Sequence, residues 1–113
     1  MYLRIIVKKE LTERILFNVN KASEAAGLLP TNETRIEEYW KFRDSNEIGM
    51  RFLPKKPLSA KACSDFFLNC FGSCDLQYND GTHLCFDRYG QRDNENERVF
   101  AVMCIPIEYV SEK

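Results

Sequence analysis

The feature that most constrains the fold is the segment at residues 59–72, SAKACSDFFLNCFG, which has helical periodicity and a clear boundary at each end. Pro54 and Pro57 break regular structure before it, Ser59 is a favourable N-cap residue, and Gly72 follows the last turn. The apolar residues that recur at helical spacing are Ala60, Cys63, Phe66, Phe67 and Cys70. This spacing predicts a helix with one apolar stripe.

The first part of the chain predicts a strand at residues 2–9 followed by a helix at residues 11–26. The strand contains a β-branched run at residues 5–7 and is apolar enough for the centre of a sheet. The helix has apolar residues at helical spacing, and Gly27 followed by Pro30 is a typical stop signal.

Thr12 is placed to cap the start of this helix. A second interpretation of this segment is open, because residues 14–19, RILFNV, also have the composition of a strand. In that alternative a shorter helix is capped by Asn20.

A first β-hairpin is predicted from strands at residues 35–43 and 48–53, joined by a turn at residues 44–46. The apolar residues that share one face of its first strand under alternation are Ile36, Trp40 and Phe42.

A second hairpin is predicted around Asp80-Gly81, because this dipeptide between alternating segments is a strong turn signal. The polar stretch at residues 91–98 contains no apolar residue and is predicted to be a loop. A last strand follows at residues 99–110, and Pro106 predicts that its second half bends away or lies at an edge.

The predicted element order is therefore β-α-β-β-α-β-β-β, in a single domain of residues 1–113. This order predicts an α+β fold, with two helices packed on one face of a mostly antiparallel sheet. A ferredoxin-like core extended by a hairpin is the nearest named architecture.

The charge distribution argues against nucleic acid as a ligand. Residues 1–58 contain eleven Lys and Arg against eight Asp and Glu, whereas residues 59–113 contain five against nine. The overall net charge is −1 and the isoelectric point is about 5.9. Proteins that bind DNA or RNA usually have clustered basic residues and a high isoelectric point, so we expect no nucleic-acid partner.

The sequence also predicts a cytoplasmic protein that does not bind a membrane. The first ten residues lack the order of charged, apolar and small residues found in secretory signals. No stretch approaches the ~20 apolar residues of a membrane span. Without an export signal, the five cysteines are expected to be reduced thiols.

Four potential zinc ligands lie close together in the sequence: Cys70, Cys74, His83 and Cys85. The Cys70-Cys74 spacing fits a structural zinc site, but the His83-Cys85 spacing does not. Cys70 also belongs to the apolar stripe of the predicted helix. We therefore expect no metal.

A catalytic thiol is the second possibility for this segment. Cys74 follows a helix C-terminus, where the helix dipole raises a thiol pKa, and His83 is the sole histidine available to activate it. Glu37, Glu38 and Asp87 are candidate acid–base carboxylates that no pattern singles out, and no phosphate-binding loop is present. We expect neither enzymatic activity nor a cofactor.

The long polar stretch after residue 88 is the most unusual feature, because hairpin loops normally have two to five residues. Long loops on rigid scaffolds often bind partners, although a purely solvent-exposed loop is the alternative. The residues predicted to bind a partner are Asp80, Asp87, Tyr89, Arg92, Asp93, Glu95 and Glu97. Their acidic character suits a basic protein partner.

In its overall profile the chain resembles the small immunity proteins of bacterial toxin–immunity systems, such as contact-dependent growth inhibition. The features that carry this resemblance are the small single domain, the reduced cysteines and the acidic stretch at residues 75–97. The resemblance implies a non-catalytic protein that neutralises a cognate toxin domain, often a nuclease, by covering its basic surface.

Two other functions stay open at this point. One is a small-ligand-binding regulatory domain that uses an open sheet face. The other is a small enzyme that uses Cys74 or His83.

Overall fold

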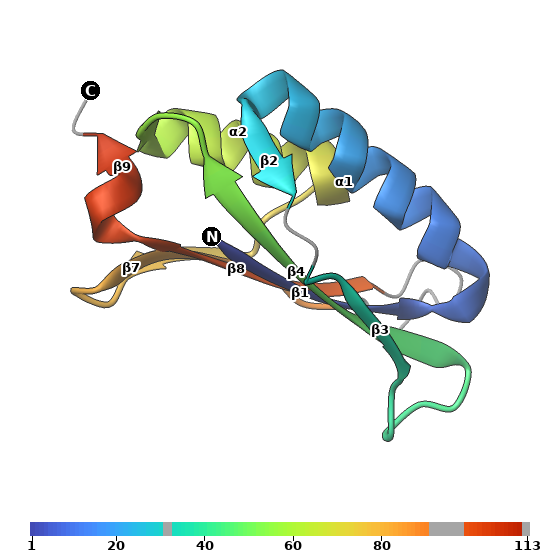
Figure 1. The fold of residues 1–113 in the computed structure, drawn as a ribbon. Coiled ribbons are helices and arrows are strands. Elements are labelled where there is room, and N and C mark those ends of the chain that lie inside the picture. Colours follow the sequence, from blue (N-terminus) through green and yellow to red (C-terminus); the bar gives the residue numbers. More distant parts are fainter. Residues whose placement is uncertain (31–32, 91–98, 112–113) are drawn as a thin grey trace.

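The fold is an antiparallel sheet with both helices on the same face (Figure 1). The computed structural model describes residues 1–30, 33–90 and 99–111. The helices are α1 (Thr12–Ala26) and α2 (Ala60–Phe71), and the longer strands are β1 (Tyr2–Lys8), β4 (Ser45–Pro54), β7 (His83–Arg88) and β8 (Val99–Pro106). The shorter strands are β2 (Leu28–Pro30), β3 (Arg35–Glu38), β5 (Leu58–Ser59), β6 (Leu76–Asn79) and β9 (Val110–Ser111).

Within the described residues the main sheet has the order β2-β4-β1-β8-β7-β6, and β3 also pairs with β4. All of these pairs are antiparallel, whereas β5 and β9 form a separate parallel pair. The sheet confirms the predicted α+β fold. Strand β1 lies between β4 and β8 as in a ferredoxin-like core, and the hairpin of β6 and β7 extends it.

Both predicted helices are present, and α1 is continuous through residues 14–19, so the strand alternative is wrong. Thr12 does not cap α1, because a short 3₁₀ turn precedes it and the Thr12 hydroxyl donates to the Lys8 carbonyl at 3.4 Å. Ser59 caps α2 as predicted: its hydroxyl oxygen accepts from the Ala62 N–H at 3.0 Å. Gly72 ends that helix in the left-handed conformation, with φ of 79°.

The core lies between the helices and the sheet, because alternate residues of the central strands point toward the helices. The strand residues in this core include Leu3, Ile5, Val7, Ile48, Met50, Phe52, Leu84, Phe86, Met103 and Ile105. Phe67 of α2 stacks on Phe86 of β7 with ring centroids 5.7 Å apart, and Phe66 meets Phe52 of β4 edge-on at 6.1 Å. In the part of the chain that the structure describes, no helix covers the opposite face of the sheet (Figure 1).

The first hairpin differs from its prediction in the position of the turn. Strand β3 ends at Glu38 and β4 begins at Ser45, so the turn spans residues 39–44 rather than 44–46. Two backbone hydrogen bonds close it: the Tyr39 N–H donates to the Ser45 carbonyl at 2.9 Å, and the Ser45 N–H donates to the Phe42 carbonyl at 3.0 Å. Residues 40 and 42 therefore lie in the turn and not on a strand face with residue 36.

The end of the chain is bent as predicted. Strand β8 ends at Pro106, a 3₁₀ turn follows at Ile107–Tyr109, and β9 then pairs with β5. Proline has no N–H to continue the ladder, which explains the position of the bend.

Candidate functional site

The turn between β3 and β4 presents a group of aromatic side chains, which we call the aromatic tip: Tyr39, Trp40 and Phe42. Trp40 is 79% exposed, the largest exposure of any large apolar side chain in the described residues. The Tyr39 ring lies 6.0 Å from the Trp40 ring and 5.6 Å from the Phe42 ring, centroid to centroid. The Lys41 ammonium lies 5.7 Å from the Trp40 centroid, a cation–π distance.

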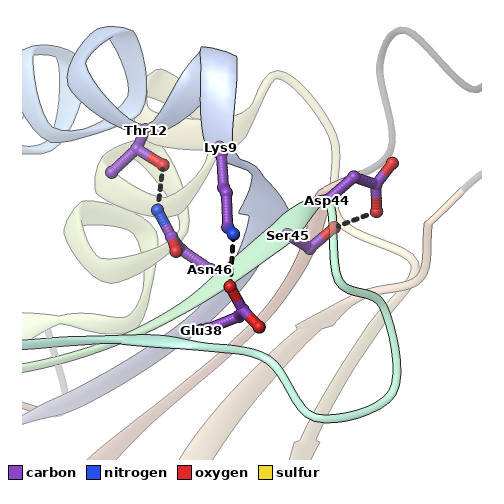
Figure 2. A network of polar contacts seen from close by, with 6 residues as sticks. All are labelled: Lys9, Thr12, Glu38, Asp44, Ser45 and Asn46. Carbon is purple, nitrogen blue, oxygen red and sulfur yellow. Dashed lines mark hydrogen bonds and ion pairs between the residues drawn. The ribbon is translucent and has the colours of Figure 1, made fainter.

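Polar contacts hold the base of this turn against the start of α1 (Figure 2). The Asn46 side-chain amide donates to the Thr12 hydroxyl at 3.0 Å, and Lys9 forms an ion pair with Glu38. The Lys9 N–H also donates to the Asp44 carbonyl at 2.8 Å. These contacts join both strands of the hairpin to the β1–α1 junction, so the aromatic tip stands on a fixed base.

An exposed tryptophan on a fixed base is suited to binding. Aromatic side chains bury about 150–250 Å² each. At roughly 25 cal/mol per Å², covering one such side chain contributes about 4–6 kcal/mol before the costs of association. Because the base is held by hydrogen bonds, the ordering cost on binding falls mainly on the exposed side chains, at about 0.5–1.5 kcal/mol each. Trp, Tyr and Arg are also the residues most enriched at interface hot spots.

Asp80, a predicted partner-binding residue, lies in the turn between β6 and β7 and is exposed. Its Oδ1 accepts from the N–H of Thr82 at 2.9 Å, the hydroxyl of Thr82 at 2.9 Å and the N–H of His83 at 2.7 Å. The backbone hydrogen bonds from Thr82 and His83 lower the pKa of Asp80. This carboxylate therefore stabilises its own turn.

Asp87, the second predicted residue, lies on β7 on the sheet face opposite the helices and is buried. Its Oδ1 has no hydrogen-bond partner among the described residues, and burial raises the pKa of Asp87. Tyr89, the third, is 55% exposed, and its N–H donates to the Asp75 carboxylate at 2.7 Å. Asp80 and Tyr89 are thus exposed whereas Asp87 is buried, and the role of all three in partner binding stays a prediction.

Arg92, Asp93, Glu95 and Glu97 lie outside the described residues. Their role in partner binding stays a prediction from the sequence.

The four potential zinc ligands are not brought together. Cys70 packs in the core on the helix side of the sheet, and burial raises the pKa of its thiol to about 12. Cys85 lies on the opposite face, where it contacts Cys104. The described residues contain no group of three or more side chains placed to hold a metal ion.

Cys74 and His83 each hydrogen-bond to a residue other than the other member of the suggested pair. The Cys74 thiol donates to the Leu76 carbonyl at 3.3 Å, and the His83 ring Nδ1 lies 2.8 Å from the Thr82 hydroxyl. Each side chain thus contacts a residue of its own segment.

The aromatic tip was missed in the sequence because alternation placed Trp40 and Phe42 on a strand face. The available signal was the run YWKFR at residues 39–43, which combines three aromatic residues with two cations. That composition is typical of interface anchors.

Comparison of the chain with protein-family models, with curated proteins and with solved structures finds no match. Neither helix of the described residues has the length and apolar character needed to cross a membrane.

Proposed function

We propose that this chain is a non-catalytic protein-binding module that acts as a cytoplasmic immunity protein and neutralises a cognate toxin domain. The proposed partner is a basic domain, for example a nuclease. Binding occludes the partner's active surface, and the chain itself catalyses no reaction.

The observation that carries this proposal is the exposure of Trp40 on a fixed hairpin base. A single exposed apolar side chain needs no explanation, but here 79% of the Trp40 side chain is exposed beside two further aromatic rings. Such a cluster supplies binding energy to a protein partner through desolvation.

A membrane surface is a less suitable ligand for the aromatic tip. Binding to anionic lipid generally uses clusters of Lys and Arg. Residues 37–44 contain two cations, Lys41 and Arg43, against three carboxylates, Glu37, Glu38 and Asp44. This excess of carboxylates disfavours an anionic lipid surface and suits a basic protein partner.

The proposal is tested with the product of the reading frame directly upstream of this gene, which a toxin–immunity arrangement makes the candidate toxin. Binding of its C-terminal domain to the wild-type chain and to Trp40→Ala is measured by titration calorimetry. We expect Trp40→Ala to raise the Kd at least about thirtyfold, which corresponds to a hot spot of about 2 kcal/mol.

The matched control is Phe17→Ala. Phe17 is an aromatic residue on α1 that is 64% exposed, and it also lies under a lysine, with the Lys21 ammonium 5.8 Å from its ring centroid. We expect this variant to bind like the wild type. Equal Kd values for Trp40→Ala and the wild type would reject the aromatic tip as the binding site, and absence of any complex would reject the proposed partner.

A second test addresses the acidic residues of the sequence prediction. Charge reversal at Asp93, Glu95 and Glu97 is expected to slow association and to weaken its dependence on salt, because steering acts on encounter rates. Association rates unchanged by all three reversals would remove these residues from the site.

A further inference from the structure

Two cysteines face each other on the sheet surface opposite the helices. Cys85 of β7 and Cys104 of β8 are directly paired in the antiparallel register, and their sulfur atoms lie 3.5 Å apart. Their neighbours Phe86 and Met103 belong to the core, so alternation places both thiols on the face opposite α1 and α2.

The same register continues across the sheet. Tyr78 of β6 pairs with Cys85, and Tyr2 of β1 pairs with Cys104. The two thiols therefore lie side by side between two tyrosines. Cys85 is 2% exposed, whereas Cys104 is half-buried and is the thiol more open to a reagent.

This geometry suits a disulfide. Residues directly opposite in an antiparallel pair have Cα atoms about 4.5–5.5 Å apart, which lies within the ~4.4–6.8 Å range that disulfides span. The sulfur atoms have to close from 3.5 Å to a bond of about 2.05 Å. Because the Cα separation of such a pair already suits a disulfide, we expect side-chain rotation to achieve this closure.

We propose that Cys85 and Cys104 form an oxidation-responsive thiol pair, which low-molecular-weight disulfides such as oxidised glutathione convert into a cross-strand disulfide. This proposal goes beyond the proposed function and does not depend on it.

The chemistry is two successive thiol–disulfide exchanges. In the first, Cys104 loses its proton and its sulfur attacks one sulfur of the oxidant. The S–S bond of the oxidant breaks and one small thiol leaves, taking up that proton. In the second, Cys85 loses its proton and attacks the Cys104 sulfur, and the second small thiol leaves protonated. Two protein thiols are oxidised and one small disulfide is reduced to two thiols.

The environment makes this exchange slow. Burial together with the neighbouring Cys85 thiol raises the pKa of Cys104 to about 12, so little thiolate is present at neutral pH. The pair is thus expected to stay reduced on brief exposure and to oxidise under sustained disulfide stress.

The remaining three cysteines are placed differently. Cys63 and Cys70 are buried in the core, and burial raises their thiol pKa values to about 11 and about 12. Cys74 is half-buried and hydrogen-bonds to the Leu76 carbonyl. Cys74 is therefore the control, because its thiol is half-buried like that of Cys104 but hydrogen-bonds to a carbonyl and not to a second thiol.

The test incubates the purified full chain with excess oxidised glutathione and follows its intact mass. We expect a product lighter than the reduced protein by two hydrogen atoms, and peptide mapping after alkylation is expected to join the peptides of Cys85 and Cys104. The product should show a higher thermal midpoint that dithiothreitol returns to the starting value, because a cross-link restricts the unfolded chain.

Two variants make the result specific. Cys74→Ser is expected to give the same linked product. Cys104→Ser is expected to give none, and this half-buried position tolerates the change better than buried Cys85 does. Glutathione adducts without the Cys85–Cys104 link in the wild-type chain, or a link through Cys74, would overturn the proposal.

Discussion

The hairpin of β3 and β4 and the hairpin of β6 and β7 lie in opposite halves of one sheet, and each joins an exposed outer strand to a buried inner strand. Their turns differ. In the β6–β7 turn, Asp80 accepts three hydrogen bonds and the Asn79 side chain accepts one more, from the Gly81 N–H at 2.8 Å. In the β3–β4 turn, the hydrogen bonds lie at the base, Trp40 is exposed, and Tyr39 and Phe42 are half-buried beside it.

The difference separates two uses of a turn. The polar groups of the β6–β7 turn stabilise the hairpin itself, because their side-chain oxygens already accept hydrogen bonds from within the turn. The β3–β4 turn is stabilised by backbone groups of Tyr39, Phe42 and Ser45 and by side chains outside the aromatic tip. None of these contacts uses the Trp40 side chain, which leaves it available for binding. An acidic residue in a turn is therefore weak evidence of a binding surface until its hydrogen bonds are known.

The largest predicted effect concerns a feature that both hairpins have, which is an inner-strand phenylalanine packed on α2. Phe52 of β4 packs on Phe66, and Phe86 of β7 packs on Phe67. Both phenylalanines are almost completely buried, so Phe52→Ala and Phe86→Ala are each expected to lower the free energy of unfolding by about 3–5 kcal/mol. Urea denaturation measures both. If only one of the two variants is destabilised, the inner strands are not equivalent.

A smaller effect distinguishes the two turns. Gly81 in the β6–β7 turn has φ of 92°, whereas no residue of the β3–β4 turn has a positive φ. Gly81→Ala is expected to lower the free energy of unfolding by about 1–2 kcal/mol, because a side chain is strained in that conformation. Lys41→Ala in the other turn is expected to change it by less than about 0.5 kcal/mol. Equal losses in thermal denaturation would contradict this distinction.

The smallest effect is a pH dependence of the β6–β7 turn. The pKa of Asp80 is lowered in the folded state, so its charged form stabilises the fold above the unfolded pKa. That contribution is lost as the pH falls through the folded pKa, which lies below the ordinary value of 3.8. The stability difference between the wild type and Asp80→Asn is therefore expected to be present at neutral pH and to shrink on acidification.

Denaturation of both proteins across this range measures the effect, and the comparison cancels the titration of Asp87, which both proteins retain. A stability difference that stays constant down to low pH would mean that the charge of Asp80 contributes nothing to the turn.

The sequence predicted the elements whose signals are local. The cap at Ser59, the stop at Gly72 and the Asp80-Gly81 turn each depend on a few neighbouring residues. The position of the β3–β4 turn was mispredicted because the period-2 pattern of residues 35–43 continued through it. The contacts that decide its position, such as Asn46 with Thr12, join residues far apart in the sequence.

The candidate site was harder to predict than the fold for the same reason. Asp87 and Asp80 are equally acidic in the sequence, yet one is buried and the other is used within its turn. The burial of Asp87 depends on pairing across the sheet, which composition does not specify. The hydrogen bonds of Asp80 are local, but the acidic composition alone does not reveal them.

The most direct test of the account uses the fluorescence of Trp40, the sole tryptophan of the chain. Acrylamide quenching is measured for the free protein and for its complex with the proposed toxin domain, whose own tryptophans are replaced by phenylalanine. We predict strong quenching in the free protein and clear protection in the complex, because the partner covers the aromatic tip. Equal quenching of Trp40 in the free protein and in a saturated complex would contradict the claim that this turn binds the partner.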